Sequence, residues 1–459
     1  MSGFFGQMRR IWGSLPLAVV VIGLLGSSAP SAQELSATER AQLQAQKEAL
    51  FQKSLRDPAN LDTAFAYADV SAKLGDNEAA VSALERMLLF NPNLPRVQLE
   101  LGALYFRMGS YDSARTYFER AAAANPPDDV KERIRTYLAE IAWRNAPHRF
   151  SAFVFSGAQY QSDANIAGSS SIAFPGFVVN LQPQFVKRHD FIAFATGSAL
   201  YSYDFGNQDA DTFEFGGTGY VNHYGTVERL NLGFIEATAG PRFNFREPLP
   251  GVISGSLKPY AIVNEVTLGS HQYFNTAGVG GESTALVWED MRFKSSVEFR
   301  QKRFANAPDR PLSTGFDGND TLVSLFAAKP ITIVPDSELS LEFDFLDQNT
   351  KFAFFTNQSY AGAAGYRIRY DDPTGFFRRP LETNFSLSRS WADYAAPDPC
   401  CGVASNRFDR RWRFAIAQTF PIAEDIAVVM QAQRDIVSSN VPLYHYTSNS
   451  VLLGSQIRF

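Results

Sequence analysis

Apolar and polar residues alternate in short segments from about residue 150 to the end of the chain. In one such segment Leu339, Leu341 and Phe343 fall on one side, and Glu342 and Asp344 fall on the other. A period of two is the geometry of a β-strand with one apolar and one polar face. Such strands suit a membrane barrel, in which the apolar face meets lipid and the polar face lines a wet lumen. Soluble β-sandwiches show the same alternation, so the rest of the sequence must decide.

Fourteen segments of this kind can be counted, and single-chain bacterial barrels have an even number of strands. We place them at residues 150–161, 190–203, 212–222, 228–240, 257–268, 275–287, 291–303, 320–329, 337–347, 358–371, 380–391, 407–420, 424–437 and 446–459. Their lengths suit tilted strands that cross an apolar band of about 25 Å. The last segment ends on Phe459, as expected of a closing strand. The sequence therefore predicts a 14-stranded antiparallel transmembrane β-barrel over residues 147–459.

A helical repeat occupies the region before the barrel. Gly75 and Gly109 are 34 residues apart (109 − 75 = 34), and Ala80 and Ala114 keep the same offset. A period of 34, with glycine at a turn and alanine in the second helix, is typical of tetratricopeptide repeats. The pattern predicts two full repeats at 60–93 and 94–127, with further helices at about 36–55 and 129–144. Repeats of this kind form surfaces that bind peptides or partner proteins.

The first residues have the pattern of a secretory signal. Arg9 and Arg10 precede a short apolar run at 15–25, and small residues follow up to Ala32. We therefore expect a signal peptide at 1–32 and a periplasmic repeat domain at 33–146. An uncleaved anchor helix is the alternative. The mean hydropathy of −0.17 argues against a helical membrane protein.

Connection lengths give a second test of the barrel. Periplasmic turns are short and outer loops are longer. If the repeats are periplasmic, the connections after even-numbered strands should be short, and those at 288–290 and 421–423 are. The longer connections after odd-numbered strands lie at 162–189, 304–319, 348–357 and 392–406. Residues 241–256 break the rule, and their role stays open. Residues 177–186 are expected to form a short strand within the first outer loop.

Charged residues recur on the polar faces of the predicted strands. The residues expected to face the lumen are Lys294, Glu298, Arg300, Glu342, Asp344, Arg367, Arg369, Arg411 and Arg413. They could line a conduit and interact with cargo. Because both signs are present, they could equally pair across neighbouring strands and make the wall rigid. The sequence leaves both interpretations open.

No pattern in the sequence indicates catalysis or a cofactor. The five histidines have no metal-ligand spacing, and the expectation is no enzyme activity, no cofactor and no metal. Cys400 and Cys401 are neighbours in a predicted loop, where a bond between them or with another chain is conceivable. The net charge of −5, without a long basic block, argues against nucleic acid as a partner.

Several stretches resemble the surface lipoprotein assembly modifiers, the Slam family. They are residues 93–102, 105–114, 125–127 and 157–165. The last of them is similar to the family's Y-D-S-N-x-N at the end of the first strand, with Gln161 where Asp is usual and Asp163 where Asn is usual. The resemblance implies an outer-membrane protein with a periplasmic repeat domain, which helps lipoproteins or soluble haem-binding proteins reach the cell surface.

These observations together lead to an expected function. The chain is expected to move an exported protein or lipoprotein cargo to the cell surface, with the repeats capturing cargo and the barrel serving as conduit or insertase. Expected partners are the cargo, outer-membrane lipid, and periplasmic chaperones or barrel-assembly machinery. The alternative is a polysaccharide export porin, although such porins usually carry many more repeats. A passive porin would have no obvious use for the repeats.

Overall fold

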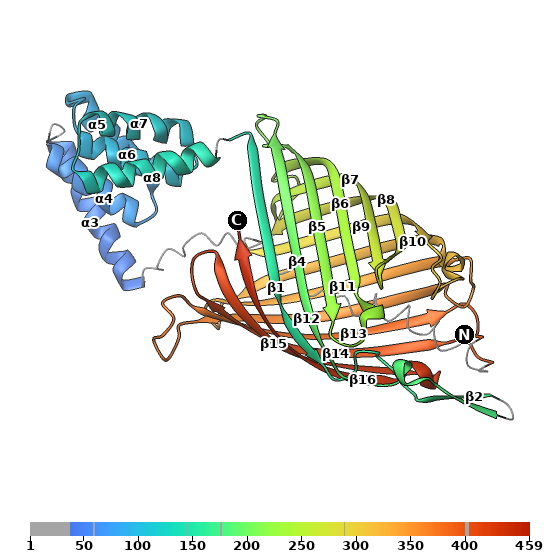
Figure 1. The fold of residues 1–459 in the computed structure, drawn as a ribbon. Coiled ribbons are helices and arrows are strands. Elements are labelled where there is room, and N and C mark those ends of the chain that lie inside the picture. The colour runs from blue at the N-terminus through green and yellow to red at the C-terminus, as the bar shows by residue number, and fades with distance from the viewer. Residues whose placement is uncertain (1–36, 58–59, 145, 175–176, 289, 400–403) are drawn as a thin grey trace. The chain divides into compact units, whose positions relative to one another are not determined.

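The computed structural model describes residues 37–57, 60–144, 146–174, 177–288, 290–399 and 404–459. The expected signal peptide at 1–32 and the cysteine pair Cys400 and Cys401 lie outside this part of the chain. Contacts divide the chain between Ala146 and Pro147 into a helical unit and a strand unit, both drawn in Figure 1.

The helical unit consists of α-helices joined by tight turns. In chain order the described helices are α3 (Ala37–Arg56), α4 (Leu61–Lys73), α5 (Asn77–Phe90), α6 (Pro95–Arg107), α7 (Tyr111–Ala123) and α8 (Asp128–Arg144). They agree with the predicted repeats, each of which is a pair of helices. Gly75 and Gly109 end the first helix of each pair with φ angles of 83° and 77°, a left-handed conformation that glycine adopts without strain.

Small side chains allow the paired helices to approach. Ala80 and Ala114 have no exposed surface, which confirms the packing role expected from the repeat. Gly102 on α6 lies against Phe118 on α7, and a Cβ at this glycine would lie 2.7 Å from the Phe118 ring. The unit thus has two apolar cores, one centred on α4–α6 and the other on α6–α8.

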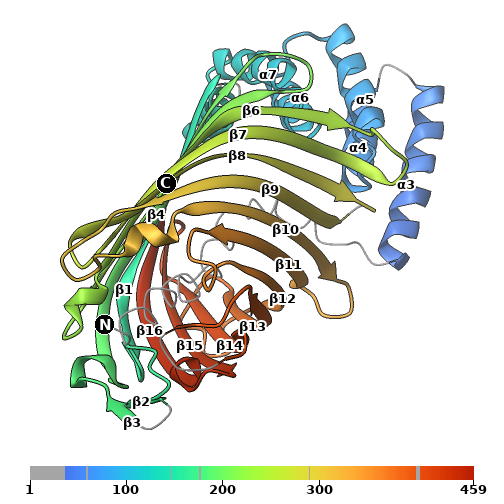
Figure 2. The same cartoon turned by 90° about the vertical axis from the view of Figure 1, so that its right-hand side faces the viewer.

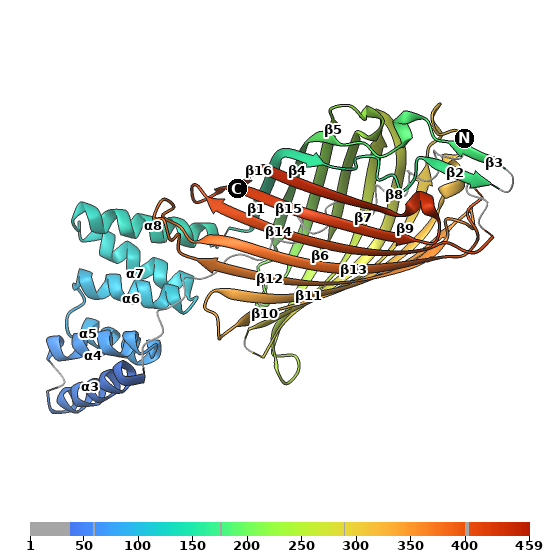
Figure 3. The same ribbon diagram turned by 90° about the horizontal axis from the view of Figure 1, so that it is seen from below.

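The strand unit is a closed antiparallel barrel of fourteen strands, as predicted (Figure 2). The barrel strands are β1 (His148–Gln161), β4 (Asp190–Asp204), β5 (Thr212–Tyr224), β6 (Leu232–Arg246), β7 (Val252–Leu268), β8 (His271–Val287), β9 (Met291–Phe304), β10 (Gly318–Ile331), β11 (Ser337–Thr350), β12 (Asn357–Tyr370), β13 (Leu381–Tyr394), β14 (Phe408–Pro421), β15 (Ile426–Ser439) and β16 (Tyr446–Arg458). Each pairs with its sequence neighbour, and β1 closes the barrel by pairing with β16 (Figure 3). Closure leaves no unpaired sheet edge.

The connection between β6 and β7 differs from the prediction. The proline-containing region 241–256 is mostly strand, and only residues 247–251 connect β6 to β7. The long connection expected at 241–256 is therefore wrong, because both flanking strands extend into this proline-containing region. In the structure Pro241 and Pro259 lie where the β6–β7 pairing is interrupted between Ala239↔Ala261 and Phe243↔Leu257, so no ladder hydrogen bond between these strands is lost. The β6–β7 connection is thus a short turn, as expected on that side, although the β7–β8 connection at 269–270 on the opposite side is shorter still.

The first long connection contains a small hairpin of its own. Strand β2 (Ser171–Phe174) pairs with β3 (Phe177–Asn180), and a 3₁₀ turn follows at Pro183–Phe185. The short strand predicted at 177–186 therefore begins at the expected residue but ends at Asn180.

The two faces of the barrel sheet differ in exposure. On β11 the exposed residues alternate with less exposed ones. Leu339, Leu341 and Phe343 are exposed, whereas Glu342 and Asp344 on the other face are partly buried. The less exposed face of a closed barrel is its interior, so the polar side chains line the inside and the apolar ones form the outside. Within the described residues, no helix combines the length and the apolar character needed to cross a membrane.

Candidate functional site

The barrel interior is the candidate site, and ion pairs between strands dominate it. Arg242 on β6 forms ion pairs with Glu214 on β5 at 2.7 Å and with Glu282 on β8 at 2.9 Å. Lys258 binds the other oxygen of Glu214 at 2.8 Å, and Lys294 binds Glu282 at 2.7 Å. Two carboxylates and three cations from the five strands β5 to β9 thus form one continuous chain of ion pairs, which cross-links this side of the wall.

A second network joins β6, β7 and β9. Arg300 contacts Glu298 at 2.6 Å and Glu236 at 3.1 Å. The hydroxyl of Tyr260 donates to Glu298 at 2.6 Å, and the amide of Asn264 donates to Glu236 at 3.2 Å. Every carboxylate of the network therefore accepts from more than one donor, which is the condition for a polar cluster to stabilise a partly buried site.

A buried ion pair lies beside this network. Lys302 on β9 pairs with Asp320 on β10, and both side chains are about 2% exposed. A buried charge is tolerated only with a partner, so the two residues depend on each other.

The remaining predicted interior cations also have acidic partners. Arg367 contacts Glu338 at 3.2 Å, and Arg369 contacts Glu382 at 2.8 Å. Arg411 and Arg413 share Asp435, at 3.3 Å and 2.9 Å. Seven of the nine predicted residues therefore lie in ion pairs, which supports the interpretation that mixed charges rigidify the wall.

Two predicted residues, Glu342 and Asp344, differ from the others. They lie two positions apart on the same face of β11, and neither forms an ion pair within the described part of the chain. Asp344 accepts a hydrogen bond from Ser324 at 2.6 Å. Within the described residues, these two acids thus add negative charge to the interior that no ion pair offsets.

Sequence reasoning missed most of the acidic partners. Glu214, Glu236 and Asp435 each lie in an alternating segment, so the period of two could have placed them on the polar face. Arg242 could not be found this way, because the predicted strand ended at residue 240. The pairing itself depends on register between strands, which the sequence alone does not supply.

The stretch that carries the family resemblance forms a buried junction beyond β1. Asp163 and Asn165 are almost fully buried. Asp163 accepts from the backbone N–H of Ala167 at 3.1 Å, and Asn165 donates to the carbonyl of Val186 and accepts from Arg229. These bonds tie the first long connection to the β5–β6 connection, so the motif residues position loops at this end of the barrel.

Other connections at the same end are also packed. Arg310 is about 1% exposed, donates to the carbonyl of Leu268 at 2.7 Å and lies over the Tyr273 ring. Phe316 packs against Phe355, with ring centroids 4.2 Å apart. The loops after β9 and β11 therefore form an ordered cluster.

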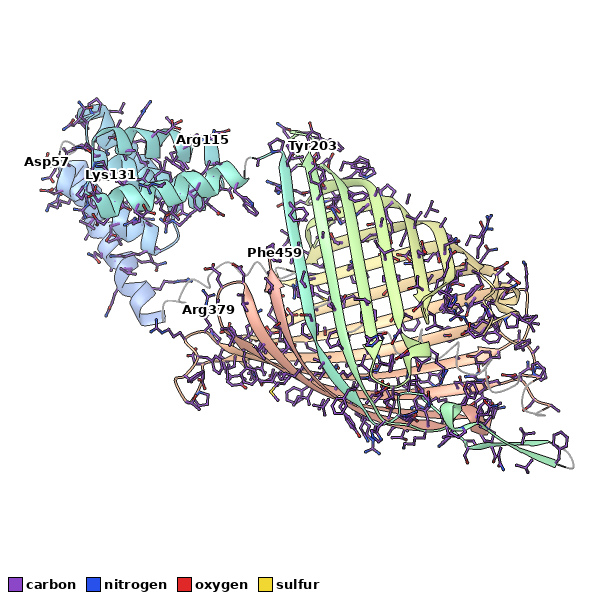
Figure 4. All side chains as sticks on the ribbon, viewed as in Figure 1. Asp57, Arg115, Lys131, Tyr203, Arg379 and Phe459 are labelled. Carbon is purple, nitrogen blue, oxygen red and sulfur yellow. The ribbon has the colours of Figure 1, made fainter. Side chains whose placement is uncertain are left out.

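The helical unit carries a polar cluster between its repeats. The hydroxyls of Tyr105 and Tyr117 donate to Glu85 at 2.6 Å and 3.2 Å, and the two rings stack. Burial, followed by the neighbouring Glu85 carboxylate, raises the pKa of both tyrosines. Leu89 and Phe90, at the end of α5, are exposed apolar residues. Figure 4 shows the side chains of both units.

The described residues contain no group of three or more His, Cys, Asp or Glu side chains placed to hold a metal ion. The expectations about enzyme activity and cofactors stay predictions.

A tetratricopeptide-repeat family model matches residues 71–132. No curated protein sequence matches the chain. Among solved structures, the chain is similar to the Yersinia enterocolitica type III secretion chaperone SycD in complex with a peptide of the translocator YopD. That match has 13% identity and a TM-score of 0.22, and covers 23% of this chain and 84% of the other.

Two further structures give similar values. PcrH in complex with the chaperone-binding region of PopD matches with 18% identity and a TM-score of 0.22, over 23% of this chain and 83% of the other. A thermophilic tetratricopeptide-repeat protein of Thermus thermophilus matches with 23% identity and a TM-score of 0.22, over 23% and 55%. The class of protein is therefore a tetratricopeptide-like helical unit joined to a closed 14-stranded barrel, an architecture consistent with transport or assembly.

Proposed function

We propose that this chain is an outer-membrane protein of the surface lipoprotein assembly modifier type, which moves an exported protein cargo to the cell surface. The observation that carries the proposal is the direct succession of a repeat unit and a closed barrel. Helix α8 ends at Arg144 and β1 begins at His148. The two units are thus joined by a short covalent tether, about 14 Å at most when fully extended.

The chemistry of each unit supports the division of labour. Exposed apolar side chains such as Leu89 and Phe90 on the helical unit suit an unfolded or extended protein. The interior charges are largely neutralised in pairs, so a passing chain meets few unpaired charges other than Glu342 and Asp344. A passive porin would leave the helical unit without a task.

The orientation follows from the same proposal. The helical unit is periplasmic, and the connections after β1, β9, β11 and β13 are on the cell surface. A tag inserted near Pro397 should bind antibody on intact cells, as should one near Asn306. A matched tag near Asp209 should bind only after permeabilisation. The reverse result would invert the topology.

The central experiment compares the surface proteome of cells with and without the gene. Loss of the chain should remove one or a few exported proteins from the surface and leave them in the periplasm. Expression of the full chain should restore them. If every exported protein stays at the surface, the proposal is wrong.

The same cells distinguish the polysaccharide alternative. A polysaccharide export porin would change the surface polysaccharide and leave surface proteins unaltered. That outcome would overturn the proposal and favour export of carbohydrate.

A further inference from the structure

Three arginines face outward on neighbouring strands of the barrel. By register, Arg389 on β13 is opposite Trp412 on β14, and Arg434 on β15 is opposite Phe414 on β14. Arg410 shares the outward face of β14 with Trp412 and is opposite Trp391. The three positively charged side chains therefore surround Trp412 on the surface that would meet lipid.

These arginines differ from those of the interior. The interior arginines of the same strands, Arg411 and Arg413, share the carboxylate of Asp435. None of the three outward arginines forms an ion pair among the described residues. The outward carboxylate nearest by register is Asp393, two residues beyond Trp391 on β13. The outward face thus keeps an excess of positive charge.

The aromatic residues hold part of this charge in place. The guanidinium of Arg389 lies 4.5 Å from the centre of the Trp412 ring and 4.9 Å from that of Trp391. Its Nε is buried without a hydrogen-bond partner among the described residues. Arg410 and Arg434 are exposed. The Arg389 cation is therefore held between two indole rings, whereas Arg410, which lies 5.7 Å from the centre of the Phe408 ring, and Arg434 remain exposed.

The positions of the three arginines along their strands indicate how deep they lie in the membrane. Arg389 and Arg434 each lie five residues before the end of their strand, at Tyr394 and Ser439, and Arg410 lies two residues after the start of β14. This is the end of the barrel opposite to the start of β1. An outward arginine is costly at the middle of a bilayer and nearly neutral close to its surface. All three arginines thus lie in the half of the wall next to this end, where an outward charge costs less than at the middle of a bilayer.

We propose that this arginine–tryptophan patch, made by Arg389, Arg410, Arg434, Trp391 and Trp412, binds the headgroup of a phosphorylated glycolipid in the outer leaflet. Three cations spread over three strands, about 10 Å wide, fit a headgroup with more than one phosphate. The indole faces offer apolar surfaces to sugar rings. Leu387, Phe414 and Ile416, further along the same faces, meet the acyl chains. Only the assignment to the outer leaflet rests on the proposed orientation; the binding itself does not.

The test uses the purified full-length protein in neutral detergent, with lipid binding followed by native mass spectrometry. The probes are diphosphoryl lipid A, phosphatidylglycerol and phosphatidylcholine. Diphosphoryl lipid A should bind most tightly. Each arginine near an anionic headgroup contributes on the order of a fivefold gain in affinity, so the R389Q/R410Q/R434Q variant should bind on the order of 100-fold more weakly.

The matched control is Arg303→Gln, which removes an exposed outward arginine on β9, away from the patch. It should leave binding unchanged. If the triple variant does not fold, judged by heat-modifiable gel migration, Arg434→Gln alone should still weaken binding several-fold, since Arg434 makes no ion pair among the described residues. Unchanged lipid A binding in the variants would overturn the proposal. Equal binding of phosphatidylglycerol by the wild type would also overturn it.

Discussion

The helical unit and the barrel stabilise their interiors with opposite chemistry. In the helical unit Ala80, Leu101 and Phe118 are fully buried, and the cores are aliphatic and aromatic. In the barrel the interior holds charges in pairs between strands, such as Arg413 with Asp435 and Lys302 with Asp320. The helical unit should therefore be sensitive to changes of volume, and the barrel interior to changes of charge.

The same comparison indicates whether each unit can fold without the other. The helices bury their apolar surface among themselves, and the barrel strands satisfy one another by closing. Within the described residues, each of these apolar cores and strand pairings lies inside one unit. Damage to one unit should then leave the other intact, and the substitutions below test this.

The largest expected effect is the loss of export when residues 33–145 are deleted. The barrel should still assemble, because its strands close without the helices. Surface display of the cargo should disappear, since the proposed capture surface is gone. Display is measured by antibody on intact cells and barrel assembly by heat-modifiable gel migration. Persistent display would show that the repeats do not capture cargo, and failed assembly would show that the units are not independent.

The second-largest expected effect concerns the buried ion pair of Lys302 and Asp320 in the barrel. Asp320→Leu should destabilise the barrel by about 3–5 kcal/mol, because Lys302 would remain buried without its counter-charge. The measurement is the temperature at which the folded gel band disappears. The double variant Lys302→Met with Asp320→Leu should recover most of the loss. Equal damage by the single and double variants would mean that volume, and not charge, limits this part of the barrel.

The barrel strands could be predicted because the alternation of side chains is local information. The segment around Leu341 and Glu342 has one face for each environment, and the structure agrees. The failure at 241–256 has a physical cause. Pro241, Pro248 and Pro250 weaken the strand pattern of this region, and Pro241 is tolerated because the pairing of β6 with β7 is interrupted at its position.

The contacts of the site could not be predicted to the same degree. Arg413 was expected on the interior face, but its partner Asp435 is 22 residues away on the next strand. Successive residues of β14 point to opposite faces of the sheet. Arg411 therefore faces inward, where it is paired, and its neighbour Arg410 faces outward. Whether an inward charge is neutralised depends on register, and only the folded sheet fixes it.

A substitution that adds volume to the core of the helical unit should lower the stability of that unit alone. Gly102→Ala should destabilise it by about 1–3 kcal/mol, because the new Cβ would overlap the buried Phe118 ring. The helical circular-dichroism signal of the full-length protein should melt at lower temperature, while the barrel gel band is unchanged. Gly109→Ala is the control for backbone strain: nothing lies within 4 Å of its added Cβ, so only the φ of 77° opposes it. Because Gly102 has no positive φ, unchanged stability of Gly102→Ala would show that the helices make room for the added Cβ and that packing does not limit this position.

The smallest expected effect is electrostatic and lies in the helical unit. The Asp76 side chain caps α5 by accepting from the backbone N–H of Ala79 at 3.1 Å, and it also pairs with Lys47. The Lys47 hydrogen bond, followed by the backbone N–H of Ala79, lowers the pKa of Asp76. A lowered carboxyl pKa means that the stabilisation is present above the ordinary aspartate pKa of about 3.9 and is lost as the pH falls through the folded-state value.

Two variants separate the cap from the charge. Asp76→Ala removes both and should cost about 1 kcal/mol at neutral pH. Asp76→Asn keeps the capping oxygen and removes the ion pair, so it should cost only a few tenths of a kcal/mol, because Asp76 is partly exposed. The wild type should lose helical stability between about pH 5 and pH 3 by more than Asp76→Asn does, as followed by circular dichroism. An identical acid profile in the two proteins would mean that the Lys47 pair contributes nothing, and that charge has no measurable part in holding the helical unit together at this position.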